Sequence, residues 1–251
     1  MKLLRIGSSG KEKPVVLDKD NKYRDLTSII KDLNPANLNF ETFSKIQSID
    51  HSTLPEISKS ERIGSCISSP GKFIAIGLNF SDHAAETGAK PPSEPIMFMK
   101  ATSSICGPND NIEIVSGSKK LDWEVELGVV IGKNAKHISV DQSQDHILGY
   151  CLVNDVSERE WQIEKMGQWV KGKSHDTYGP IGPYLVSKDE ITDVNNLNMF
   201  LDLNGNRMQT GNTSTMIFNV DTIVSYVSKF MSLQAGAVSY THLTLPTKRI
   251  V

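Results

Sequence analysis

The sequence has few cysteines, no long apolar run and no excess of either charge. Cys66, Cys106 and Cys151 are odd in number and widely spaced, which argues against a zinc motif or a disulfide framework. No stretch reaches the roughly 18 apolar residues of a membrane helix, and the N-terminus lacks the apolar core of a secretion signal. The net charge is −2, with both signs interspersed and no basic cluster. We therefore predict a cytoplasmic protein without nucleic-acid or membrane partners.

The pattern of apolar residues indicates two unequal parts. Residues 1–61 predict a small unit with short strands and a helix over 25–33. From residue 71 to residue 236 valine-rich strands dominate, among them one over 110–115, and a helix is predicted over 219–233. Strands outnumber helices, so the predicted class is α+β with a β-rich core.

The sequence pattern of the last residues differs from that of the rest of the chain. The string VSYTHLTLPT, residues 238–247, matches the translation of a transposon-end adapter used in sequencing libraries. We expect residues 238–251 to be a non-native tail and the gene to be interrupted near Gly236 or Ala237, although a native C-terminal strand is the alternative. A segment of this origin is left out when the fold is predicted.

Two glutamates interrupt the apolar stretch LDWEVELGVVIG, Leu121–Gly132. Side chains two apart on a strand share a face, so Glu124 and Glu126 are expected to lie side by side. Buried together they would repel one another unless a cation lay between them, and carboxylate oxygens suit Mg²⁺, Mn²⁺ or Ca²⁺. A solvated strand face explains the same pattern.

Further candidates follow the same reasoning. Asp155 closes the apolar run ILGYCLVND, either as a third ligand or as a helix cap. His83 and Glu86 are three apart and adjoin on a helical turn, as a base with its orienting carboxylate or as a surface pair. Lys171 and Lys173 occupy a Gly/Ser-containing loop, where a lysine could meet an anionic oxygen or simply be solvated.

The order of these segments resembles the fumarylacetoacetate hydrolase family over residues 71–236. The segments are IGLNFSDHAAE, PIMFMK, LDWEVELGVVIGK, GYCLVNDVSEREWQ, KGKSHDTYGPIGP and LNGNRMQTGNTSTMIF. The resemblance implies a mixed β-roll catalytic domain with a small N-terminal α+β domain, assembled as a homodimer. It implies one Mg²⁺ or Mn²⁺ ion held by Glu124, Glu126 and Asp155, and a catalytic dyad of His83 and Glu86.

The resemblance also assigns Lys173 as an active-site lysine, and Arg159 and Gln162 as substrate-facing groups, although Arg159 could instead pair with a helix carboxylate. The family normally continues past the segment Leu233–Gly236 with a Thr-Gly-Thr-Pro loop that contacts the substrate. Here the expected foreign tail follows, so we expect that contact and part of the core to be missing.

The implied activity is hydrolysis of a carbon–carbon bond in a 2,4-dioxo acid, either an acylpyruvate or a 2,4-diketo-3-deoxy sugar acid, to pyruvate and an acid. Lyase, isomerase or decarboxylase chemistry, such as that of ureidoglycolate lyase or 2-hydroxyhepta-2,4-diene-1,7-dioate isomerase, uses the same platform. The sequence does not separate these reactions, because residues that contact the far end of a substrate lie on variable loops. An inactive fragment is the remaining alternative, and the expected truncation supports it.

Overall fold

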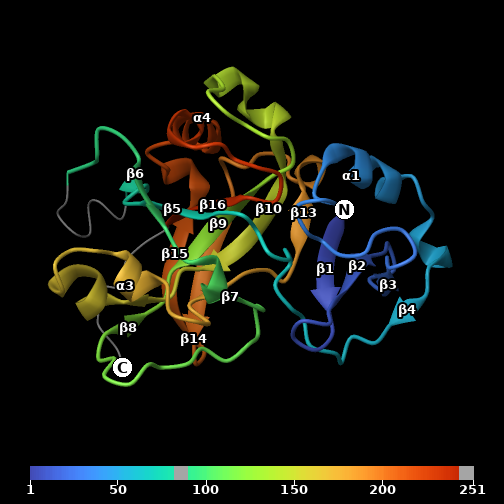
Figure 1. The fold of residues 1–251 in the computed structure, drawn as a ribbon, viewed down its shortest axis with the longest axis horizontal. Helices are drawn as coiled ribbons and strands as arrows, with labels where there is room; N and C mark the ends of the chain where they lie inside the picture. The colour runs from blue at the N-terminus through green and yellow to red at the C-terminus, as the bar shows by residue number, and fades with distance from the viewer. Residues whose placement is uncertain (82–89, 243–251) are drawn as a thin grey trace.

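One ten-stranded sheet organises the computed structural model, which describes residues 1–81 and 90–242 (Figure 1). Its strands are β1 (Lys2–Ile6), β2 (Lys13–Leu17), β3 (Tyr23–Asp25), β4 (Glu56–Ile57), β5 (Phe73–Gly77), β6 (Ile96–Met99), β9 (Val125–Ile131), β10 (Ile147–Asn154), β13 (Leu185–Ser187) and β16 (Val238–His242). They follow the order β4-β3-β2-β1-β13-β10-β9-β16-β5-β6, so neighbours in space are often distant in sequence.

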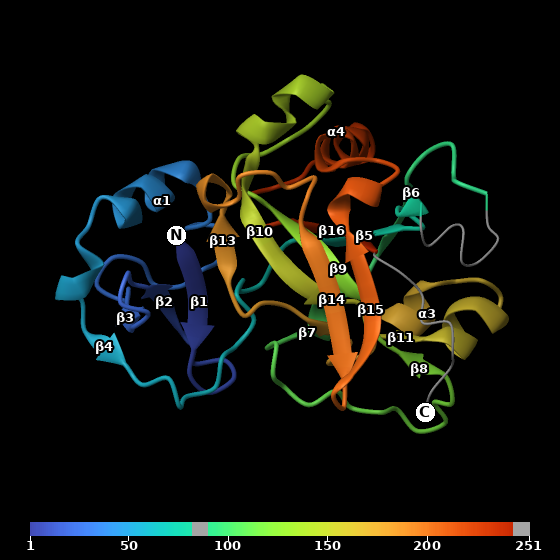
Figure 2. The ribbon, with the colours of Figure 1, turned by 180° about the vertical axis from the view of Figure 1, so that it is seen from behind.

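Smaller elements surround this sheet. The paired strands are β7 (Ile105–Cys106) with β12 (Gly179–Pro180), β8 (Leu121–Asp122) with β11 (Ser157–Glu158), and β14 (Asn198–Leu203) with β15 (Asn206–Asn212). The helices are α1 (Phe40–Gln47), α3 (Val170–Lys173) and α4 (Val220–Phe230), with short turns η1 (His51–Thr53), η2 (Thr102–Ser104), η3 (Val140–Asp145), η4 (Glu160–Glu164), η5 (Lys188–Glu190) and η6 (Thr213–Thr215). Figure 2 shows the β14–β15 hairpin lying in front of β9, against which β14 packs. The predicted α+β class with few helices is confirmed.

The N-terminal strands continue the main sheet. β1 pairs antiparallel with β13, and Lys2 and Leu3 lie opposite Val186 and Leu185. One buried apolar cluster joins the two parts, since it contains Leu3 as well as residues of β5, β9 and β10. Residues 1–61 are therefore held to the rest of the chain by both backbone pairing and a shared core.

Local patterns predicted some elements correctly and others wrongly. The helix α4 has Asn219 as its N-cap, with the side chain accepting from the backbone N–H of Thr222. The helix expected over 25–33 is wrong, because the chain makes only a turn there and the helix of this region is α1. The strand expected over 110–115 is also wrong, because its backbone lacks a ladder partner in the described chain and Glu113 N–H instead donates to the Thr177 hydroxyl.

Arg62, which lies between the two parts in sequence, is linked to both of them by a charged network. The Arg62 guanidinium donates to Glu12 in the N-terminal part at 2.8 Å and to Asp110, which follows β7, at 2.7 Å. The hydrogen bonds from Arg62 hold the pKa of the Asp110 carboxyl below its ordinary value. Burial alone would raise the pKa of Glu12, but Arg62 and Arg5 lower it overall.

Replacing Arg62 by glutamine should lower the free energy of unfolding at pH 7 by about 1.5–3 kcal/mol, the range for hydrogen bonds to charged groups. A carboxyl whose pKa is lowered by folding stabilises the folded state at pH values above its ordinary pKa. That stabilisation is lost as the pH falls through the folded-state pKa. Urea unfolding of wild type and variant should therefore differ at pH 7, and the difference should shrink as the pH falls below the ordinary carboxyl pKa values.

A matched control is Arg207→Gln, because Arg207 pairs with Asp202 in an exposed setting. It should change the free energy of unfolding by less than about 0.5 kcal/mol. Equal effects of the two substitutions would contradict the role given to Arg62.

β16 lies in the middle of the sheet, between β9 and β5. Val238–His242, which were expected to lie outside the fold, pair antiparallel with β9 and parallel with β5. The buried hydroxyls of Ser239 and Tyr240 have no hydrogen-bond partner in the part of the chain that the structure describes. An unselected sequence placed in a core strand would produce such a misfit, and the foreign origin of residues 238–251 stays a prediction.

Replacing Tyr240 by phenylalanine should raise the free energy of unfolding by about 1 kcal/mol, because an unpaired buried hydroxyl is removed. Burial, followed by the charges of Asp155, Glu126 and Glu124, raises the pKa of Tyr240 well above its ordinary value. Thermal unfolding followed by circular dichroism measures the change. The control Tyr226→Phe removes a hydroxyl that donates to Glu94 at 2.7 Å, so it should not stabilise the protein; destabilisation by Tyr240→Phe would contradict the account.

Candidate metal centre

Three buried carboxylates meet where β9 begins and β10 ends. Glu124 directly precedes β9, Glu126 lies within it, and Asp155 directly follows β10. The antiparallel pairing brings them together, because Asp155 N–H donates to the Glu124 carbonyl at 2.9 Å and Val153 lies opposite Glu126. One oxygen of each carboxylate lies within 4.8 Å of the others, and each residue is at most 2% exposed. The structure thus brings together the three predicted ligands.

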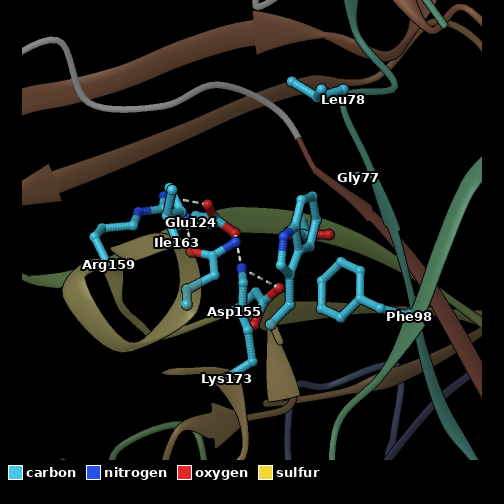
Figure 3. A pocket seen from close by; sticks show the side chains of 11 residues that line it. Gly77, Leu78, Phe98, Glu124, Asp155, Arg159, Ile163 and Lys173 are labelled. Atoms are coloured by element: carbon cyan, nitrogen blue, oxygen red, sulfur yellow. Dashed lines mark hydrogen bonds and ion pairs between the residues drawn. The ribbon is translucent and has the colours of Figure 1, made fainter. Parts of the chain in front are cut away.

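Lys173, at the end of α3, lies between two of these carboxylates (Figure 3). Its Nζ donates to Glu124 Oε2 and Asp155 Oδ2, each at 2.7 Å. Burial alone would lower the pKa of Lys173, but the charges of Asp155 and Glu124 raise it above its ordinary value. By contrast, Lys171 is exposed and donates to the Lys165 carbonyl.

A second buried lysine, Lys100, was not singled out from the sequence. Its Nζ donates to Asp155 Oδ1 at 2.5 Å and to the carbonyls of Val156 and Tyr178 at 3.0 and 2.7 Å. Burial lowers the pKa of Lys100 although Asp155 opposes the shift. Three acceptors require the three N–H donors of the ammonium form. A usable signal existed, because Lys100 closes the strand PIMFMK as Asp155 closes its own strand.

Arg159 lies beside the cluster and is held by two carboxylates. It donates to Asp122 at 2.8 Å, to the Gln162 side-chain oxygen at 2.9 Å, and to Glu124. Burial raises the pKa of Asp122 although Arg159 opposes the shift. Arg159 and Gln162, the predicted substrate-facing residues, both line a cavity at the cluster. Arg159 pairs with carboxylates of the β8–β9 region rather than of a helix.

The charges of this cluster favour one added cation. Four carboxylates face three cationic side chains, which leaves one net negative charge in a buried site. The carboxylates are Asp122, Glu124, Glu126 and Asp155, and the cations are Lys100, Arg159 and Lys173. Hard oxygen donors suit Mg²⁺ or Mn²⁺. The residues present therefore fit a single divalent ion held by Glu124, Glu126 and Asp155.

Five of these charged groups form the floor of a cavity of about 160 Å³, namely Glu124, Glu126, Asp155, Arg159 and Lys173. Its other walls carry Leu78, Phe98, Ile163 and Trp169. Figure 3 shows Phe98 on one side of Lys173 and Ile163 with Arg159 on the other. With a divalent ion held by the carboxylates, the arrangement can bind a small anionic molecule at the cluster and pack its remainder against apolar side chains.

The predicted dyad of His83 and Glu86 lies outside the described residues, so its placement stays a prediction. Gly77 and Leu78, shortly before it in sequence, line the cavity. Among residues 1–81 and 90–242, no helix is long and apolar enough to cross a bilayer.

Comparison with known proteins identifies the family. Residues 72–241 match the family described as fumarylacetoacetate (FAA) hydrolase, C-terminal. The chain belongs to the fumarylacetoacetate hydrolase family. This family includes hydrolases and isomerases, and its matched region contains the whole carboxylate cluster.

Relatives within this family cover most of the chain. A protein of Burkholderia lata named as a hydrolase is 54% identical over 241 residues, which are 96% of this chain and 86% of that protein. The fumarylacetoacetate hydrolase of Exiguobacterium antarcticum is 30% identical with a TM-score of 0.85, covering 97% and 87% of the two chains. The 2-hydroxyhepta-2,4-diene-1,7-dioate isomerase of Mycobacterium marinum is 27% identical with a TM-score of 0.73, covering 100% and 90%.

Proposed function

We propose that the chain is a metal-dependent hydrolase that cleaves a carbon–carbon bond in a 2,4-dioxo acid, an acylpyruvate or a 2,4-diketo-3-deoxy sugar acid. The observation that carries the proposal is the buried cluster of Glu124, Glu126 and Asp155 with Lys173 between two of them, at the floor of a cavity. Membership of the fumarylacetoacetate hydrolase family supports it.

The three carboxylates would hold Mg²⁺ or Mn²⁺, which supplies a positive charge that polarises the carboxylate and 2-oxo groups of such an acid. Lys173 places an ammonium group at the same floor, where it stabilises an oxygen that gains negative charge. Its position is fixed, because two carboxylates hold it in a buried setting.

His83, oriented by Glu86, is proposed to take a proton from water, which adds to the distal carbonyl carbon. The bond between that carbon and its neighbour towards the carboxylate then breaks. Its electron pair goes to the pyruvate fragment, which takes up a proton, and the other fragment leaves as a carboxylic acid.

Isomerisation is the second candidate, since one structural relative is named as an isomerase of a 2-hydroxy-diene-dioate. Such a reaction needs the same polarised acid but neither adds water nor releases pyruvate. Pyruvate release therefore separates the two functions on one substrate panel.

The test uses the whole chain, stripped with EDTA and reloaded with Mg²⁺ or Mn²⁺. Acylpyruvates and a 2,4-diketo-3-deoxy sugar acid are supplied, and pyruvate is measured with lactate dehydrogenase and NADH. The proposal predicts pyruvate release that depends on the added ion; full activity in EDTA would refute the metal requirement. A thermal shift with Mg²⁺ plus oxalate, an anion that resembles pyruvate enolate, tests whether the site is formed, and the absence of any melting transition would favour the inactive-fragment alternative.

A further inference from the structure

Lys100 contacts the carboxylate cluster from outside the cavity. The residue directly follows β6 and is 1% exposed. Among the described residues, Lys173 lines the cavity and Lys100 does not. The two lysines divide the oxygens of Asp155 between them, since Lys100 Nζ donates to Oδ1 at 2.5 Å and Lys173 Nζ donates to Oδ2 at 2.7 Å. Lys100 therefore holds a candidate metal ligand without being placed to touch a substrate in the cavity.

The ammonium group of Lys100 joins three segments that are far apart in sequence. Besides Asp155, which follows β10, Nζ donates to the carbonyl of Val156 at 3.0 Å and to that of Tyr178 at 2.7 Å. The Tyr178 carbonyl also accepts from the Val156 N–H at 3.1 Å. Because each of the three N–H donors has its own acceptor, the ammonium group fixes the carboxylate and both carbonyls relative to one another. One buried group thereby holds together the end of β6, the end of β10 and the loop that follows α3.

The end of β6 also contacts the segment that carries Lys173. Ala101, next to Lys100, donates its backbone N–H to the Ser174 hydroxyl at 2.9 Å, and Ser174 directly follows Lys173. Lys173 Nζ lies 5.3 Å from the centroid of the ring of Phe98, two residues before Lys100. The end of β6 therefore contributes to the positions of both lysines at the cluster.

Charge and position predict opposite effects of Lys100 on a bound cation. If only its charge mattered, removing Lys100 would take the cluster from one net negative charge to two and would strengthen the attraction for a divalent ion. If its position matters, removing Lys100 frees Asp155 Oδ1 and takes this donor away from two carbonyls, so the carboxylate is no longer held in place. Position is favoured, because all three N–H donors are used by acceptors on a buried backbone and a buried carboxylate.

We propose that Lys100 is a positioning residue of the metal centre, which holds Asp155 by Oδ1 and leaves Oδ2 to the cluster. Oδ2 is the oxygen that shares the Lys173 ammonium group with Glu124, so a cation at the cluster competes with Lys173 for it. The two lysines therefore act in opposite ways, because Lys100 supports ion binding and Lys173 opposes it. The inference rests on the proposed function for the presence of the ion, and it adds a residue that touches neither the ion nor the substrate.

The first experiment measures the Mn²⁺ affinity of Lys100→Met by isothermal titration of the EDTA-stripped chain. Methionine keeps an unbranched side chain of similar length and removes all three donors. The dissociation constant for Mn²⁺ should rise by about 10–100-fold, the range for residues that orient a metal ligand, even though the cluster becomes more negative. Lys173→Met should change the dissociation constant in the opposite direction in the same assay. An affinity of Lys100→Met equal to or above that of the wild type would overturn the proposal.

The electron paramagnetic resonance spectrum of bound Mn²⁺ separates positioning from a general loss of stability. At saturating Mn²⁺ the spectrum of Lys100→Met should differ from that of the wild type, because a displaced carboxylate changes the ligand field of the ion. Lys72→Met is the matched control, since Lys72 directly precedes β5, the neighbour of β6, and its amino group donates to Gln234 at 2.6 Å. It should change neither affinity nor spectrum. Weaker binding by Lys100→Met with an unchanged spectrum would overturn the positioning role.

A second variant, Lys100→Gln, keeps an N–H donor on a shorter side chain and should also bind Mn²⁺ more weakly with a changed spectrum. Failure of both variants to fold, judged by circular dichroism, would assign Lys100 to the fold alone and overturn the proposal. Mn²⁺ binding does not depend on turnover, so the outcomes for the two proposals are distinct. Weaker binding by Lys100→Met, with a wild type that binds Mn²⁺ but releases no pyruvate, would support the positioning role and reject the hydrolase. No Mn²⁺ binding by the folded wild type would overturn both.

Discussion

Replacing Glu126 by glutamine should abolish turnover, with kcat/KM falling by at least about 10³-fold. The substitution keeps the size of the side chain and removes its charge from a position that is 1% exposed. The net charge of the floor then becomes zero without a metal, so the electrostatic reason for binding a divalent ion is lost. Steady-state pyruvate release at saturating Mg²⁺ measures the effect.

The control for this substitution is Glu113→Gln, which removes an exposed carboxylate outside the cluster. It should leave kcat/KM within about twofold of wild type, as surface substitutions usually do little. Circular dichroism should show that both variants are folded. Activity of Glu126→Gln near the wild-type level would contradict the assignment of Glu126 as a ligand.

Replacing Lys173 by methionine should lower kcat by about 10²–10³-fold, because the floor loses the ammonium group that stabilises developing negative charge. Affinity for Mn²⁺ should move the other way and rise about tenfold, because a cation 2.7 Å from both Glu124 and Asp155 is removed. A purely structural role would not produce this pairing of slower turnover with tighter metal binding.

Lys171→Met is the matched control on the same short helix, since its amino group is exposed and bonded to a backbone carbonyl. Both rate and metal affinity should stay close to wild type. A joint loss of rate and metal affinity in Lys173→Met would instead point to disruption of the cluster, and an unchanged rate would remove Lys173 from the mechanism.

The sequence predicted which residues are the candidate ligands, but it did not predict the geometry that brings them together. Two-residue spacing placed Glu124 and Glu126 on one face, and the end of an apolar strand marked Asp155. Their closeness to one another depends on the pairing of β9 with β10, which no local pattern specifies. Lys100 shows the same limit, because its link to Asp155 joins residues 55 positions apart.

The fold, too, was predicted only in part. Apolar runs located β9 and β10, and the helix predicted over 219–233 corresponds to α4. The order of strands was not predictable, since β13 lies between β1 and β10 and β16 lies between β9 and β5. These neighbours meet through long-range pairing, whereas propensity and periodicity describe only near neighbours in the chain. The homodimer and the roles of His83 and Glu86 stay predictions.

The most direct test of the carboxylate cluster is isothermal titration of the EDTA-stripped chain with Mn²⁺. The account predicts one site per chain in the wild type and in Glu113→Gln, and no measurable binding in Glu126→Gln. Binding of the same affinity and stoichiometry in Glu126→Gln, or no binding by folded wild-type protein, would contradict a divalent ion held by Glu124, Glu126 and Asp155.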